Sequence, residues 1–198
     1  MLALIVVSSS LTPTGEPPMP TAKFNDLPEA QRSALAEKFF QNFEFWDELT
    51  IDMVKIAFLD LFGDEPETAY SIGGGNEYFA VAGTISYQKG FMEKIRANYS
   101  HDEELVKLAH EWRDLQRKHF YKLSAKCSMW RDNTTVTAYN DQHPHGWSTN
   151  EEESAVNDII ISFNHWALKK MNEEYKFQTA PEAVADFYGD EEIEIEIE

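Results

Sequence analysis

The stretch TAYSIGGGNEYFAVAGTISY, residues 68–87, decides the fold class. Residues 68–72 and 78–87 are rich in aromatic, β-branched and small apolar side chains, a composition typical of strands. Between them the sequence GGGN, residues 73–76, can adopt the positive φ angles of a tight turn at little cost. The stretch therefore predicts a β-hairpin, and with it an antiparallel sheet.

A second hairpin is expected farther along the chain. Its strands are KLSAKCSMW and TTVTAYN, separated by Arg131, Asp132 and Asn133. Apolar and polar residues alternate through the first of these strands, so one of its faces should be buried and the other exposed.

Helical spacing of apolar residues fills the segments around the two hairpins. We expect helices to begin at or just after Asp26, Thr50, Gly90, Ser100, Ser148 and Pro181. Ser100 and Ser148 are each followed three residues later by a glutamate, the spacing of a capping box. The helix after Ser100 is expected to bury apolar side chains as far as Phe120. The order ααββααββαα predicts an α+β fold, in which two β-hairpins form an antiparallel sheet packed by about six helices.

Three segments are expected along the chain. Residues 1–22 are predicted to be a disordered or mis-started N-terminal arm, because the Pro-rich stretch TPTGEPPMP allows Met19 to be the start in place of Met1. Residues 23–188 form a single α+β domain, and residues 189–198 form an acidic C-terminal tail.

The formal net charge is −18, and acidic residues concentrate towards the end of the chain. Residues 149–198 carry 14 acidic side chains against Lys169, Lys170 and Lys176. Such charge repels phosphate groups, so direct binding to nucleic acid or to an anionic membrane is disfavoured and a basic protein partner is favoured. The single cysteine, Cys127, excludes an intrachain disulfide and is consistent with the reducing cytoplasm of a bacterial cell.

The chain ends on GDEEIEIEIE, residues 189–198. In an extended strand the glutamates would point one way, at intervals of about 6.6 Å, and the isoleucines the other way. A disordered acidic tail is the alternative. DNA has one phosphate per about 3.4 Å of each strand, so glutamates spaced about 6.6 Å apart would have a lower charge density than DNA. Acidic residues of the preceding helix would therefore have to add to the charge of the tail. The candidate partner-binding residues are Glu151, Glu152, Asp158, Glu173, Glu174, Asp190, Glu191, Glu192, Glu194, Glu196 and Glu198.

No catalytic signature stands out, and we expect a protein that is not an enzyme and needs no cofactor. The loop DQHPHGWSTN places His143 near His145, and zinc would need a further ligand such as His165 or Cys127. A polar loop without metal is the simpler interpretation. A small metal-dependent hydrolase remains as an alternative.

Two segments, residues 71–90 and 102–126, resemble a family of small acidic proteins of bacteriophage and prophage genomes. That family has a W-S-Q-G-D-G-A-x-F-type hairpin, then Y-x-Y-x-K-G, then a D-E-E-L helix that runs into Q-R-x-x-F-Y-x-L. The matching residues are Gly74, Gly75, Phe79, Gly83, Tyr87, Lys89, Gly90, Asp102, Glu103, Glu104, Leu105, Gln116, Arg117, Phe120, Tyr121 and Leu123. The resemblance implies a phage accessory protein, from a group loosely labelled antitoxin-like or hypothetical. The composition is separately similar to that of phage DNA-mimic anti-restriction proteins.

These observations lead to one principal hypothesis. The protein is expected to bind and inhibit a host nucleic-acid-processing or defence protein by acidic DNA mimicry, using the basic surface of that DNA- or RNA-binding partner. The alternative partner is a basic toxin, which the protein would neutralise as an antitoxin.

Overall fold

The computed structural model describes residues 21–189 and 193–194. The elements are β1 (Thr21–Ala22), the 3₁₀ helix η1 (Phe24–Asp26), α1 (Glu29–Gln41), α2 (Glu48–Phe62), β2 (Glu67–Ser71), β3 (Tyr78–Ser86), α3 (Phe91–Tyr99), α4 (Glu103–Lys118), β4 (Leu123–Trp130), β5 (Asn133–Asn140), α5 (Asn150–Gln178), α6 (Pro181–Tyr188) and β6 (Ile193–Glu194). The predicted α+β fold is confirmed, because both hairpins and the helices around them occur in the predicted order.

The chain divides into two compact units. The smaller unit combines residues 1–43 with residues 181–198, and the larger unit is residues 44–180. The segment 23–188, expected as a single domain, therefore contributes to both units.

The larger unit is built on a four-stranded antiparallel sheet of order β2-β3-β4-β5. The two hairpins meet where β3 pairs with β4, and Gly83 lies opposite Cys127 there. In the second hairpin Trp130 pairs with Asn133, so the turn contains one residue fewer than the sequence predicts. Arg131 opens this turn with a φ of 56°, a positive angle that tight hairpin turns require.

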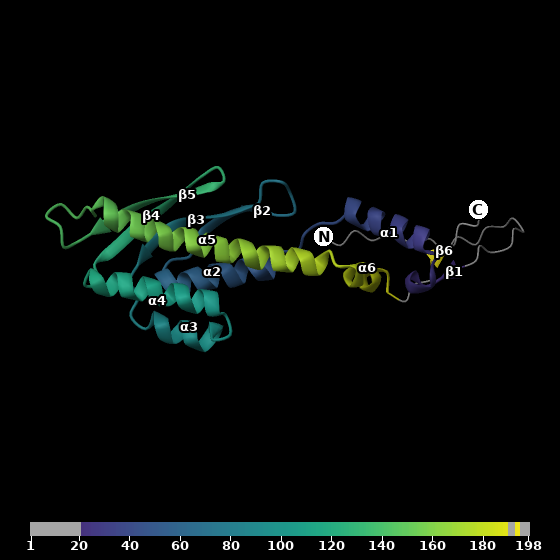
Figure 1. Ribbon diagram of the computed structural model, residues 1–198, viewed down its shortest axis with the longest axis horizontal. Coiled ribbons are helices and arrows are strands. Elements are labelled where there is room, and N and C mark those ends of the chain that lie inside the picture. The colour runs from purple at the N-terminus through teal and green to yellow at the C-terminus, as the bar shows by residue number, and fades with distance from the viewer. Residues whose placement is uncertain (1–20, 190–192, 195–198) are drawn as a thin grey trace, which may run out of the picture. The chain divides into compact units, whose positions relative to one another are not determined.

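Helices cover one face of the sheet. α5 and α2 contact the strands, α4 packs on α5, and α3 packs on α2 and α4 (Figure 1). The strand side chains in the core include Val81, Ile85, Leu123, Ala125, Cys127 and Ala138. The alternate side chains of β4 and β5, such as Lys126 and Thr137, are exposed, so the opposite face of the sheet is open to solvent.

The core between α2, α4 and α5 is aromatic. Phe58 meets Phe163 edge to face at a ring separation of 5.2 Å, and Phe62 meets Trp112 in the same way at 5.5 Å. The predicted apolar stripes are buried, including Val54, Ala57, Phe58, Leu61 and Phe62 of α2 and Val156, Ile159, Ile160, Phe163, Ala167 and Met171 of α5.

The ends of α4 differ from the prediction. Its N-cap is Asp102 and not Ser100, because the carboxylate of Asp102 accepts a hydrogen bond of 3.0 Å from the backbone N–H of Leu105. Phe120, predicted to be buried, is 70% exposed. The helix ends at Lys118, and positive φ angles at Phe120 and Tyr121 then turn the chain towards β4.

The start of α5 also differs from the prediction, by one residue. The capping box is formed by Thr149 and Glu152, and not by Ser148 and Glu151. Ser148 instead donates its hydroxyl to the carbonyl oxygen of Ala138 at 2.8 Å.

The smaller unit has its own apolar cluster around Phe24, Leu27 and Val184. Tyr188 of α6 stacks on Phe24 with ring centroids 5.2 Å apart and donates its hydroxyl to the carbonyl oxygen of Leu35 at 3.0 Å. α1 begins after Pro28, and Asp26, expected to cap this helix, belongs to η1.

The two ends of the chain are described only in part. β1 pairs with β6 in antiparallel fashion, with Thr21 opposite Glu194 and Ala22 opposite Ile193. The remaining parts of the predicted arm and tail, residues 1–20, 190–192 and 195–198, lie outside the described residues. Within the described part of the chain, no helix has both the length and the apolar character needed to cross a membrane.

Candidate functional site

The acidic residues predicted to bind a partner are placed in very different surroundings. Asp190, Glu191, Glu192, Glu196 and Glu198 lie outside the described residues, and Glu194 is placed only as backbone of β6. Glu151, Glu152, Asp158, Glu173 and Glu174 all belong to α5. Glu152 is buried, and the other four are exposed or half-buried.

These α5 residues do not form one surface. Glu151 lies in the first turn of the helix, and Glu174 lies close to its C-terminal end. At about 1.5 Å per residue, roughly 35 Å of helix separates them. The two ends of α5 therefore have to be considered as separate candidate sites.

At the C-terminal end of α5, hydrogen bonds bring in acidic residues from other segments. Asn172 donates to a carboxylate oxygen of Glu77, in the β2–β3 connection, at 3.0 Å. The amide of Gln178 donates to Glu174 at 2.7 Å, and its oxygen accepts the backbone N–H of Trp46 at 3.0 Å. Residues that are far apart in the sequence are thus fastened to one end of the helix.

Two further contacts complete this arrangement. Tyr70 of β2 donates its hydroxyl to the carboxylate of Asp47, immediately before α2. Tyr175 of α5 packs edge to face on Phe45 at 5.6 Å. Both contacts hold the segment before α2 against the sheet and α5.

We define the acidic end of the larger unit as Glu44, Asp47, Glu48, Glu77, Glu173 and Glu174. Lys170 approaches Glu173 at 3.4 Å, but the same ammonium group also pairs with Asp102 at 3.1 Å. Lys169, which lines a surface hollow together with Glu173, and Lys176, in the last turn of α5, are the other lysines at this end of the helix. The six carboxylates therefore outnumber the nearby cations, and the acidic end carries a net negative field.

The opposite end of α5 holds a buried carboxylate cluster. Glu152 is only 7% exposed. It accepts hydrogen bonds from the backbone N–H of Thr149 at 2.7 Å and from the side-chain amide of Asn140 at 2.6 Å. Nδ1 of His119 and Nε2 of His143 lie 2.9 and 3.0 Å from its oxygens. The cluster joins the end of α4, the end of β5 and the first turn of α5.

The surroundings of Glu152 keep it ionised. Burial raises its pKa, but hydrogen bonds from Thr149, Asn140 and His143, and the charge of His143, outweigh burial and lower the pKa to about 2. The charge of Glu152 is therefore compensated by groups inside the protein, and Glu152 is not part of the partner-binding surface.

The ligands considered for a metal site are not brought together. His143 turns towards Glu152, and Cys127 lies in the core, where burial raises the pKa of its thiol to about 12. Among the residues that the structure describes, no three His, Cys, Asp or Glu side chains are placed to hold a metal ion.

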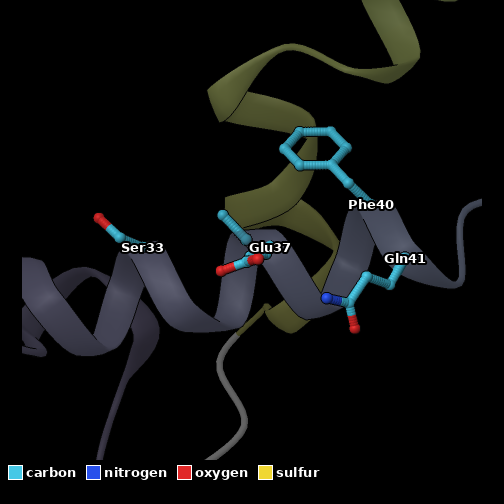
Figure 2. A pocket seen from close by; sticks show the side chains of 5 residues that line it. Ser33, Glu37, Phe40 and Gln41 are labelled. Carbon is cyan, nitrogen blue, oxygen red and sulfur yellow. The ribbon is translucent and has the colours of Figure 1, made fainter.

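Open hollows occur on single helices. One on α1 is lined by Ser33, Ala36, Glu37, Phe40 and Gln41 (Figure 2). Another on α5 is lined by His165, Leu168, Lys169, Asn172, Glu173 and Lys176. Small-molecule sites are concave and bring together polar groups from several elements, which neither hollow does.

The family model described as Domain of unknown function (DUF8835) matches residues 70–181, more than half of the chain. The chain belongs to this family. The DUF8835 match runs from within β2 to the first residue of α6, so it includes the Glu152 cluster and, from the acidic end, Glu77, Glu173 and Glu174. No curated protein and no solved structure matches the chain.

Proposed function

We propose that the protein is a phage-encoded accessory protein that binds a host nucleic-acid-processing or defence protein in the bacterial cytoplasm and inhibits it by acidic DNA mimicry. The acidic end would occupy the partner's cationic nucleic-acid site. The observation that carries this proposal is the gathering of carboxylates from three separate segments of the chain at one end of α5.

Several of these carboxylates are held in place before any partner binds. Glu77 is held by Asn172, Glu174 by Gln178 and Asp47 by Tyr70. Each carboxylate has more lone pairs than these bonds use, so oxygen atoms remain available to lysine and arginine side chains of a partner. Fixed carboxylates lose less conformational entropy on binding than mobile ones do, and this favours recognition of a cationic groove.

The proposal changes the predicted surface in two ways. Glu151, Asp158 and the buried Glu152 are outside the acidic end. Four residues that were not predicted join it, namely Glu44, Asp47, Glu48 and Glu77. The acidic residues after Gly189 remain in the proposal as a second contribution, which a variant truncated after Gly189 tests.

A pair of charge-matched variants tests the proposal. DNA cleavage by a panel of purified bacterial restriction nucleases is measured with the wild-type chain, with E48Q/E173Q and with E151Q/D158N. Each variant removes two exposed charges, one of them from the first turn of a helix. We expect E48Q/E173Q to weaken inhibition about tenfold and E151Q/D158N to leave it unchanged.

Equal effects of the two variants, or inhibition that is insensitive to salt, would contradict DNA mimicry through the acidic end. Neutralisation of a basic toxin, with no nuclease of the panel inhibited, would support the antitoxin alternative instead.

A further inference from the structure

The chain carries a basic segment in spite of its negative net charge. Between Asp114 and Asp132 there are 17 residues without an acid, and five of them are basic. These five are Arg117, Lys118, Lys122, Lys126 and Arg131. All are exposed, and none forms an ion pair with another residue of the described part of the chain.

Exposed aromatic side chains accompany these cations. Trp130 is 71% exposed, and Phe120 and Tyr121 are exposed in the same segment. Trp147, also exposed, contacts Tyr139 with ring centroids 5.4 Å apart and forms an isolated β-bridge with it. Large aromatic surfaces left in water are typical of binding sites rather than of a surface that only keeps a protein soluble.

Some of these basic and aromatic side chains lie along β4, on the open face of the sheet. Lys126 lies between Thr84 of β3 and Thr137 of β5. Ser124, at the start of β4, lies opposite Tyr139, and Trp130 ends the strand. Since alternate residues share a face, Lys126 and Trp130 point to the same side, and the path from Ser124 to Trp130 is roughly 20 Å long.

Acidic residues border this path on both sides. Asp64 accepts the backbone N–H of Thr84 at 3.1 Å, at the β3 side. Glu153 accepts the backbone N–H of Ala138 at 3.2 Å, at the β5 side. At the two ends of the path, exposed Asp132 follows Arg131, and Asp141 donates its backbone N–H to the carbonyl oxygen of Lys122 at 3.4 Å. The positive field is therefore centred on Lys126, in the middle of β4.

The acidic end does not cancel this field. His119 contacts Glu152, so the basic segment begins near the N-terminal end of α5. Glu173 lies 21 residues farther along the helix, roughly 30 Å away, whereas the Debye length at physiological salt is about 8 Å. The whole-chain net charge, which disfavours nucleic acid, is thus a poor guide to this surface.

We propose that the open face of the sheet binds single-stranded nucleic acid. The phosphates would lie on Lys122, Lys126 and Arg131, and bases would stack on Trp130 and on the Tyr139–Trp147 pair. Exposed rings next to cations are the pairing that single-strand binding uses, because unpaired bases offer stacking faces that a duplex hides. This second surface is independent of the acidic end and of the function proposed for it.

Fluorescence anisotropy of labelled 12-nucleotide oligo(dT) and oligo(rU) tests the proposal. We expect both to bind, W130A to weaken binding at least fivefold, and K126Q to weaken it and to reduce the salt slope by about 0.7. The matched control K107Q changes an exposed lysine of α4 and should bind as the wild type does. Thermal unfolding of each variant checks that the fold is retained.

Three outcomes would overturn the proposal. They are no binding at low salt, binding that W130A and K126Q leave unchanged, and equal affinity for a duplex of the same length or for heparin, since charge alone would then explain the binding. E48Q/E173Q, which changes only the acidic end, should bind the oligonucleotides as the wild type does.

Discussion

The side-chain amide of Asn140 donates a hydrogen bond of 2.6 Å to the carboxylate of Glu152, and so the last residue of β5 is fastened to the first turn of α5. His119 and His143 meet the same carboxylate. One buried side chain therefore fixes how the second hairpin, α4 and α5 meet.

Replacing Glu152 with glutamine should destabilise the protein. Glutamine keeps the shape and the capping position, but it removes the negative charge that the two histidines and Asn140 contact. We expect a loss of about 1–3 kcal/mol in the free energy of unfolding, measured with urea. E151Q, which changes the exposed neighbour, should cost less than about 0.5 kcal/mol. Equal effects would mean that the cluster does not stabilise the fold.

The contribution of Glu152 should depend on pH in a defined direction. Its folded pKa of about 2 lies below the ordinary value of 4.5, so the unfolded state takes up the proton first as the pH falls. The stabilisation is complete above pH 4.5 and disappears as the pH falls from 4.5 towards about 2. The difference in unfolding free energy between wild type and E152Q should shrink over that window. A difference that grows there would contradict the assignment.

Gly73 should not tolerate a side chain. Its φ is 75°, and an added Cβ would lie 2.7 Å from the ring of Tyr175. G73A should therefore destabilise by about 1–3 kcal/mol in urea unfolding, through backbone strain at a positive φ and displacement of the Tyr175 ring. Gly74 has open space around it, and G74A is the matched control, with little effect expected. Equal stabilities would show that the β2–β3 turn does not pack on α5, and Glu77 would then not be fixed at the acidic end.

Phe120 holds a strained backbone conformation that its exposed side chain does little to offset. Its φ of 52° is uncommon for a bulky residue, and asparagine tolerates such angles better. F120N should raise the free energy of unfolding by about 1 kcal/mol, since the exposed ring leaves few contacts behind. Phe177, 73% exposed near the end of α5, is the control, and F177N should give no gain. A destabilised F120N would mean that packing of the Phe120 ring contributes more to stability than the backbone strain costs.

The helices, the hairpins and the core could be predicted because their signals are local. The alternation in residues 123–129 and the helical stripe from Val156 to Met171 each repeat within one element, and the structure buries both. The choice of cap at α5 could not be predicted in this way. Ser148 and Thr149 both have a glutamate three residues later, and the choice depends on Asn140 and His143, which come from outside the helix.

The acidic end shows the same limit. Glu173 and Glu174 are visible as acidic residues near the end of a long helix. Their proximity to Glu77 depends on a hydrogen bond from Asn172, which is 95 residues away from Glu77 in the sequence. No local sequence pattern predicts this contact. The basic path along β4 cannot be seen in the net charge of the chain, because its few cations, Lys122, Lys126 and Arg131, are outnumbered by acids elsewhere in the sequence.

Competition with DNA tests the central claim most directly. The inhibition constant of the chain against a responsive nuclease is measured at increasing concentrations of a non-cleavable duplex. If the acidic end occupies the DNA site, the apparent inhibition constant rises linearly with duplex concentration, and E48Q/E173Q raises it further at every concentration. An inhibition constant that does not change with duplex concentration would show that the chain binds elsewhere on the nuclease, and the DNA-mimic account would be wrong.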